Sequence, residues 1–293
     1  MKEIQDDEFR IIGQRDGASS AEGRKGWRRW LPWAVAAIVL ATVVCMICFS
    51  GAKSQSAKGE EVVFDPTPEP IPAAAAASPL SRADRNTTRA FTERIDTVIN
   101  DVSLAIYIPH NAVPGLAIGT PDINDKRIVL VTQAADIRAD NGRIAGAFVV
   151  DGKPLSWSLS KRGYCGIIDG HITVGTADSS PLFEEAVEKG GSFFRQYPLV
   201  DNGQPIDNEP KGKSIRKALC DRAGEIFVAI SNTPESFHDF AQALADLQID
   251  NAIYLVGSDS YGYWRNADGR LTQLSLKRRG GYKYENYIRW MSD

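Results

Sequence analysis

The sequence predicts an α+β domain, with a mixed, mostly antiparallel sheet and a few packed helices, preceded by one transmembrane helix. Short apolar runs rich in β-branched residues are separated by turn signals such as Asp169-Gly170, which is typical of antiparallel hairpins. Segments with helical spacing are few and do not alternate regularly with strands, which disfavours a doubly wound parallel sheet. One long uncharged apolar stretch lies ahead of all these elements.

The apolar stretch at residues 31–49 contains no charge and has Trp30 and Trp33 at one edge, as in an interfacial aromatic belt. About 19 residues rising ~1.5 Å each cover ~28 Å, close to the hydrocarbon thickness of a bilayer. The positive-inside rule puts the N-terminus in the cytoplasm, because Arg24, Lys25, Arg28 and Arg29 precede the span. A signal peptide cleaved near residues 50–52 is the alternative.

These features divide the chain into four parts. Residues 1–29 form a basic cytoplasmic tail and residues 30–51 the membrane helix. Residues 52–85 form a Pro/Ala-rich spacer that we expect to be extended, because it lacks an apolar pattern. Residues 86–293 form the soluble domain, expected in the periplasm or another extracytoplasmic space.

Composition excludes several function classes. The 34 basic and 37 acidic residues give a formal charge of -3, without the basic excess of a nucleic-acid-binding protein. No P-loop, Rossmann, G-x-S-x-G or H-E-x-x-H motif occurs, so serine-triad hydrolysis and nucleotide binding have no support in the sequence, which leaves the cofactor unknown. His110, His171 and His238 lack metal-ligand spacing. Cys165 and Cys220 are either a disulfide of an oxidising compartment or two small buried strand residues.

The first half of the domain is predicted to open with a helix, because Phe91, Ile95, Val98 and Ile99 recur at helical spacing after the capping residues 86–87. Strands are then expected at residues 103–108, 127–133 and 144–150. A hairpin follows at 164–168 and 172–175, with a helix at 180–189 and a strand at 192–200.

The second half is predicted to contain a hairpin of residues 215–220 and 225–231. Thr233-Pro234-Glu235 indicates a helix start, with a capping threonine and proline at the first helical position. Residues 251–256 form an apolar strand that is expected to lie centrally. A last hairpin is expected at 261–264 and 271–274.

The short motifs of residues 127–266, and their order, resemble those of the phosphodiester glycosidase family, whose eukaryotic member removes N-acetylglucosamine from a phosphodiester-linked sugar. IAGAF at 144–148 stands where the family has a pattern like I-N-G-G-F. PLV with the following Asn-Gly at 198–203 is similar to a family strand and turn. RKA at 216–218 occupies the position of the family's Arg-Thr-Ala. LVGSDS at 255–260 occupies the position of its L-D-G-G-G-S loop.

The chain departs from this family at two motif positions, since Ala145 replaces an asparagine and Val256 replaces the loop aspartate. Asp259 lies three residues beyond the aspartate position and is the nearest carboxylate for general-base work. An aspartate that caps a turn is the alternative. The resemblance implies the α+β fold of the family and a divergent bacterial branch.

Arg216 matches the family arginine and is, with Asp259, our expected catalytic residue, because a planar guanidinium pairs with two phosphate oxygens at once. Gly257, Ser258 and Ser260 form a turn of small residues that can present N–H groups and hydroxyls to an anion. A strand-surface arginine and an ordinary turn are the alternatives.

Arg195 lies between Phe193 and Tyr197, an arrangement that suits a sugar phosphate or a buried arginine stacked for packing. Tyr261 lies beside the small-residue turn, where it can form a sugar platform or pack across strands. We therefore assign Arg195, Gly257, Ser258, Ser260 and Tyr261 to substrate binding.

Two functions are carried forward from the sequence. The first is a membrane-anchored envelope hydrolase that cleaves a sugar-phosphate diester at the anomeric carbon. The second is a non-catalytic glycan-phosphate-binding or envelope-organising module on the same fold. The expected partners are a sugar-phosphate or glycan ligand and, through the N-terminal helix, the membrane, with no nucleic acid.

Overall fold

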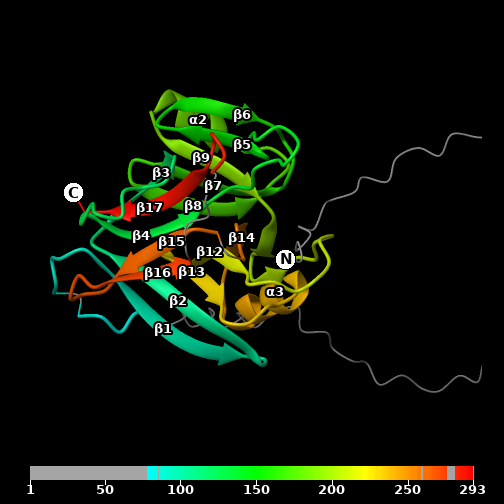
Figure 1. Cartoon of the computed structure of the whole chain (residues 1–293). Helices are drawn as coiled ribbons and strands as arrows, with labels where there is room; N and C mark the ends of the chain where they lie inside the picture. Colours follow the sequence, from blue (N-terminus) through cyan, green and yellow to red (C-terminus); the bar gives the residue numbers. More distant parts are fainter. Residues whose placement is uncertain (1–77, 85, 259, 276–280, 293) are drawn as a thin grey trace, which may run out of the picture. The chain divides into compact units, whose positions relative to one another are not determined.

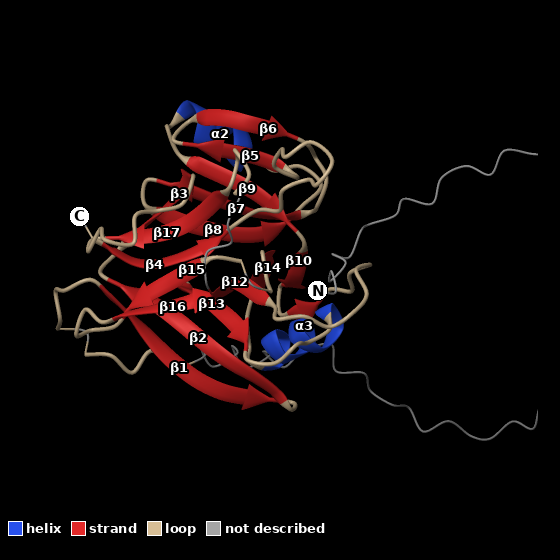
Figure 2. Cartoon of the chain, in the orientation of Figure 1, coloured by secondary structure: helices blue, strands red, loops and turns tan. Residues whose placement is uncertain are grey.

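Three antiparallel sheets make up the part of the chain that the structure describes (Figures 1 and 2). The structure is a computed structural model that describes residues 78–84, 86–258, 260–275 and 281–292. Within these residues every strand pairing is antiparallel and two helices occur, so the fold is β-rich. This confirms the mostly antiparallel sheet expected from the sequence.

The predicted membrane span, residues 30–51, lies outside the described residues. Among those that are described, no helix combines the length and the apolar character needed to cross a bilayer.

The largest sheet has seven strands in the order β1-β2-β13-β12-β14-β10-β11. As predicted, β14 lies inside it, between β12 and β10. Its strands are β1 (Phe91–Ile99), β2 (Val102–His110), β10 (Pro198–Asp201), β11 (Gln204–Pro205), β12 (Lys217–Arg222), β13 (Glu225–Ser231) and β14 (Asn251–Leu255).

The helix expected at the start of the domain is wrong, because residues 91–99 form β1 and pair with β2 along their whole length. Inward and outward positions alternate along β1, and Val98, which the helical spacing placed inside, is 64% exposed. Asn100 and Asp101 both have positive φ, as a two-residue hairpin turn requires. The period of two, together with this turn, outweighed the helical spacing of a few apolar residues.

Two five-stranded sheets complete the domain, in the orders β16-β15-β4-β17-β3 and β6-β5-β9-β7-β8. The first contains β3 (Val113–Ile118), β4 (Ile128–Gln133), β15 (Gly262–Arg265), β16 (Leu271–Ser275) and β17 (Asn286–Met291). The second contains β5 (Ala147–Val150), β6 (Lys153–Trp157), β7 (Gly163–Ile168), β8 (His171–Thr176) and β9 (Ser192–Gln196). The predicted hairpins β7–β8, β12–β13 and β15–β16 are confirmed.

The two helices cover different sheets, as Figure 1 shows: α2 (Leu182–Glu188) packs on β9, β7 and β5, and α3 (Phe237–Asp246) on β10, β11 and β2. The predicted start of α3 at Thr233 is wrong. Ser236 is the cap, and its Oγ accepts a hydrogen bond from the Asp239 N–H at 2.9 Å. Glu235 instead forms an isolated β-bridge with Ser214, so residues 233–235 are drawn away from the helix.

Buried side chains from all three sheets form one continuous core cluster, which includes Cys165 on β7. Cys220 on β12 belongs to a second cluster, beneath α3. Both thiols are free and buried, so they are buried strand residues and not a disulfide. Burial raises the pKa of both thiols well above the ordinary value.

The strand expected over residues 192–200 is two strands in different sheets, β9 and β10, with Tyr197 between them. The carbonyl oxygen of Tyr197 accepts a hydrogen bond from the Tyr254 N–H at 2.8 Å. At Tyr197 the chain therefore crosses from the five-stranded sheet that contains β9 to the seven-stranded sheet. This crossing brings the two sheets together near the end of β14.

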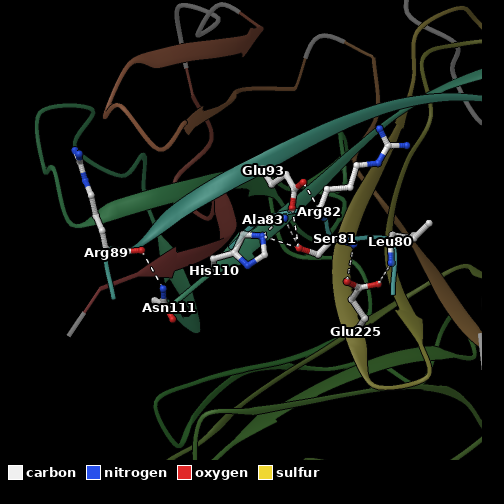
Figure 3. A network of polar contacts seen from close by, with 9 residues as sticks. All are labelled: Leu80, Ser81, Arg82, Ala83, Arg89, Glu93, His110, Asn111 and Glu225. Atoms are coloured by element: carbon white, nitrogen blue, oxygen red, sulfur yellow. Dashed lines mark hydrogen bonds and ion pairs between the residues drawn. The ribbon is translucent and has the colours of Figure 1, made fainter. Parts of the chain in front are cut away.

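Residues 78–84, hereafter the strap, belonged to the expected spacer but are hydrogen-bonded to β1 and β13 of the seven-stranded sheet (Figure 3). The Glu225 carboxylate accepts the N–H groups of Leu80 and Ser81 at 2.9 and 3.1 Å. The Glu93 carboxylate accepts the Arg82 N–H at 3.0 Å and the Ser81 hydroxyl at 2.8 Å. The segment that enters the domain is thus fixed by two carboxylates.

Candidate functional site

Tyr254, near the end of β14, lies where the small-residue turn meets the loop before β12, which carries Arg216. Its hydroxyl accepts a hydrogen bond from the Gly257 N–H at 3.0 Å. The Ser258 N–H donates to the Ile215 carbonyl at 2.8 Å. A Cβ at Gly257 would lie 2.2 Å from the same Ile215 oxygen, so this close approach requires glycine. The turn is therefore held against the residue that precedes Arg216.

Arg216 is 6% exposed, and its guanidinium is held by backbone carbonyls and an aromatic ring. Its Nε donates to the Glu235 carbonyl at 2.8 Å and one terminal nitrogen to the Gly212 carbonyl at 2.7 Å. The guanidinium carbon lies 4.2 Å from the centre of the Phe237 ring. These contacts fix a charged fork in one geometry and join the loop before β12 to the start of α3.

A second charged group, the Lys161 ammonium, reaches the same region from the loop between β6 and β7. Lys161 forms an ion pair with Asp136, and its ammonium donates to Gln196 Oε1 at 2.9 Å. The ammonium also lies 4.5 Å from the centre of the Tyr197 ring. The Lys161 side chain is 9% exposed and that of Asp136 34%, so water reaches the carboxylate more readily than the ammonium. Ala145, the family's asparagine position, donates its N–H to the Asp136 carbonyl at 2.8 Å.

Electrostatic effects connect the two halves of this region. Burial raises the pKa of Tyr254, the Asp136 charge raises it further, and the charge of Arg216 and a hydrogen bond with it oppose the rise. Burial and Asp136 also raise the pKa of Tyr197. Both phenols therefore remain protonated at neutral pH. We call Asp136, Lys161, Gln196, Tyr197, Arg216 and Tyr254 the Tyr254 cluster.

The expected binding residues of the turn have structural contacts. Ser258 has a positive φ of 49°, as the sharp bend requires. Ser260 accepts a hydrogen bond from the buried Lys217 ammonium at 2.7 Å and donates its own hydroxyl to the Val256 carbonyl. The Lys217 ammonium also donates to the Ser260 carbonyl at 2.9 Å. Asp259, the expected second catalytic residue, lies outside the described residues.

The Arg195 guanidinium has none of the hydrogen-bond partners of Arg216. Arg195 is 2% exposed, and its guanidinium donates to the carbonyls of Lys161, Ala177 and Asp178 at 2.9, 3.1 and 3.0 Å. It therefore holds together the segments that flank β7 and β8, including the one that carries Lys161. This is the packing alternative weighed from the sequence.

Tyr261 is 8% exposed and packs in a separate cluster of tyrosines. Its ring makes edge contacts with Tyr263 and Tyr287, with centroid distances of 6.0 and 6.2 Å. The packing interpretation describes its environment, because the ring faces other tyrosines.

Asp136, Lys161, Gln196 and Tyr254 carry no signal that singles them out in the sequence. They come from four segments at least 25 residues apart, which long-range contacts bring together around Tyr197. Lys161 has a positive φ of 70°, an uncommon backbone state for lysine that a sequence pattern does not reveal. Across the described ranges, no group of three or more His, Cys, Asp and Glu side chains is placed to hold a metal ion.

No protein-family model matches the chain, and no curated protein matches it. Among solved structures, the chain is similar to the catalytic domain of zebrafish N-acetylglucosamine-1-phosphodiester alpha-N-acetylglucosaminidase, auto-inhibited by its pro-peptide. The identity is 13%, the match covers 73% of this chain and 86% of that one, and the TM-score is 0.49. A hypothetical protein from Synechocystis matches at 12% identity, 69% of this chain and 62% of that one, with a TM-score of 0.49. Both are distant likenesses at the level of the fold.

Proposed function

We propose that the domain binds a phosphodiester-linked sugar at the Tyr254 cluster and hydrolyses the bond between the anomeric carbon and the phosphate. One observation supports this site above others: the Tyr254 hydroxyl interacts with both the Arg216 guanidinium and the Gly257 N–H. A fixed cation, a phenol and a close-approaching backbone are what a phosphodiester oxygen needs. The sugar-phosphate class itself comes from the family resemblance of residues 127–266.

The reaction needs little general-acid catalysis by the protein, because a phosphate ester is already a good leaving group. Water adds to the anomeric carbon, the carbon–oxygen bond to phosphorus breaks, and the phosphomonoester leaves with the bonding electrons. Asp136, held by Lys161 and partly open to solvent, accepts the proton that the water loses. Arg216 and the Tyr254 hydroxyl stabilise the charge that develops on the departing phosphate.

A binding module without turnover is the second candidate, and two features favour it. Arg216 donates to the carbonyls of Glu235 and Gly212, which commits part of its fork to the fold. The family asparagine and aspartate are Ala145 and Val256 here. This candidate predicts saturable binding of a sugar phosphodiester with no release of sugar.

The test uses the methyl phosphodiester of N-acetylglucosamine 1-phosphate and measures the release of reducing sugar. Tyr254→Phe keeps the ring that packs 4.9 Å from Phe237 but removes the hydroxyl. We expect a roughly 10²-fold loss of kcat/KM, the cost typical of one transition-state contact. Tyr282→Phe, at a tyrosine that is 53% exposed, is the matched control.

The outcomes separate the candidates. Binding by the unmodified protein without sugar release favours the non-catalytic module. Turnover that Tyr254→Phe leaves within twofold of normal refutes the site. If the unmodified protein neither binds the diester nor releases sugar from it, both functions are refuted.

We also propose that residues 30–51 anchor the domain in the membrane with residues 86–293 outside the cytoplasm. The support is the uncharged apolar stretch and the cations that precede it. Protease added to intact spheroplasts should degrade the domain and spare a cytoplasmic marker. Protection of the domain until the membrane is lysed would contradict this orientation.

A further inference from the structure

Gln196, the last residue of β9, has a buried amide whose orientation is fixed by its neighbours. It is 0% exposed, and its Oε1 accepts hydrogen bonds from the Lys161 ammonium at 2.9 Å and the Tyr197 N–H at 3.0 Å. Two donors meet the same end of the amide, so that end is the oxygen and the other end is Nε2. Among the described residues, Nε2 has no hydrogen-bond partner.

An unpartnered buried donor is costly, at about 1–3 kcal/mol, so such a group in a charged cluster calls for an acceptor. The Lys161 ammonium beside it is a donor and does not fill that need. Asp136 pairs with the same ammonium and is partly open to solvent. The cluster therefore offers a ligand one amide donor and one carboxylate acceptor, joined by Lys161.

We propose that Gln196 Nε2 and the Asp136 carboxylate recognise hydroxyl groups of the sugar ring, which makes Gln196 a specificity-determining residue of this site. The proposal rests on the proposed function. A hydroxyl accepts from Nε2 through a lone pair and donates its hydrogen to Asp136, so it satisfies both groups. A peptide carbonyl would be repelled by the carboxylate, and an ammonium would leave Nε2 unpaired.

The backbone around Lys161 keeps this arrangement in place. Its positive φ of 70° is a costly conformation for lysine, and its carbonyl is held by the Arg195 guanidinium at 2.9 Å. The ammonium is thereby fixed against Gln196 Oε1, which orients Nε2 before a ligand arrives. Preorganised donors of this kind contribute to selectivity because little ordering remains to be done on binding.

The experiment measures binding of a non-hydrolysable phosphonate analogue of the sugar phosphodiester to the full chain in detergent by calorimetry. A series of analogues lacks one ring hydroxyl at a time. Gln196→Glu keeps an oxygen that faces Lys161 and the Tyr197 N–H but replaces the Nε2 donor. Inorganic phosphate, measured with both proteins, reports the purely electrostatic effect of the added carboxylate.

In the unmodified protein, we expect loss of one particular hydroxyl to weaken binding about 3- to 10-fold. In Gln196→Glu, the parent analogue should bind correspondingly weaker after correction for phosphate, and loss of that hydroxyl should have no further effect. This coupling identifies the hydroxyl that Gln196 holds.

Two results overturn the inference. If every analogue of the series binds the unmodified protein within twofold of the parent, Gln196 contacts a buried water only, and the proposed function survives without it. This comparison needs no variant, so it holds even if Gln196→Glu fails to fold. If no sugar phosphonate binds the unmodified protein, the proposed function and this inference fall together.

Discussion

The contact between Glu225 and the strap gives a sharp test of how the domain is joined to the rest of the chain. The carboxylate accepts two backbone N–H groups, from Leu80 at 2.9 Å and from Ser81 at 3.1 Å (Figure 3). Glu225→Gln keeps the length of the side chain but leaves one acceptor oxygen and places an N–H donor against the second backbone N–H. One charge-assisted hydrogen bond is lost and the other becomes neutral.

Hydrogen bonds to charged groups contribute about 1.5–3 kcal/mol and neutral ones about 0.5–1.5 kcal/mol. Loss of the first bond by itself should therefore cost the docked strap about 1.5–3 kcal/mol, and the weakening of the second adds to this. Since every ~1.4 kcal/mol is a factor of ten, local opening should become roughly 10- to 150-fold more frequent. The rest of the domain should keep its stability, because the strap precedes β1 and forms none of the strand pairings.

Hydrogen exchange followed by mass spectrometry checks this directly, on the peptide that contains residues 80–82. Exchange there should accelerate, while the peptide that spans β14 remains unchanged. Glu188→Gln, on the exposed end of α2, is the matched control and should change neither peptide. Acceleration of less than threefold in Glu225→Gln would refute the carboxylate clamp.

Further predictions concern pH, a buried cation, a close approach and two thiols. Burial alone would raise the pKa of Glu93, but hydrogen bonds from the strap and its histidine partner outweigh it, so the pKa lies below 4.5. A depressed carboxyl pKa stabilises the fold above the unfolded value, so the protection of the strap amides, corrected for the intrinsic exchange rate at each pH, should be lost only as pH falls below about 4.5. Arg195→Met should lower the free energy of unfolding by at least about 3 kcal/mol in urea titrations, because three carbonyls lose their donor. Gly257→Ala should abolish sugar-phosphonate binding or folding, because its Cβ would lie 2.2 Å from a backbone oxygen; normal binding would contradict the geometry. Cys165 and Cys220 should react with a thiol reagent only in denaturant, as peptide mapping can show; labelling of the native domain would contradict their burial.

Much of the sheet could be predicted because turns and alternation are local. Asp169-Gly170 fixed the β7–β8 hairpin through two residues with positive φ, and the period of two specified which side of each strand is buried. The error at residues 91–99 had the same local origin, since a few apolar residues fit two periods at once. Only the pairing of these residues with β2 decides between the helical period and the strand period.

The candidate site was predictable in part, because Arg216 and Gly257 lie in short segments that resemble a family pattern. The segments that carry them are joined by a hydrogen bond from the Ser258 N–H to the Ile215 carbonyl. The other members of the Tyr254 cluster were not predictable. Lys161 and Gln196 are ordinary residues in their own segments, and only long-range contacts give them a role.

The sequence by itself determined the strand-and-turn pattern, the uncharged apolar stretch near the N-terminus and the small-residue turn after β14. These depend on neighbours within a few residues, where steric and solvation preferences act directly. The tertiary structure alone decided that the chain changes sheets at Tyr197, that Arg195 supports backbone carbonyls, and that Asp136 and Lys161 meet near Tyr254. Such contacts join distant segments, and their free energy depends on packing geometry that no local pattern encodes.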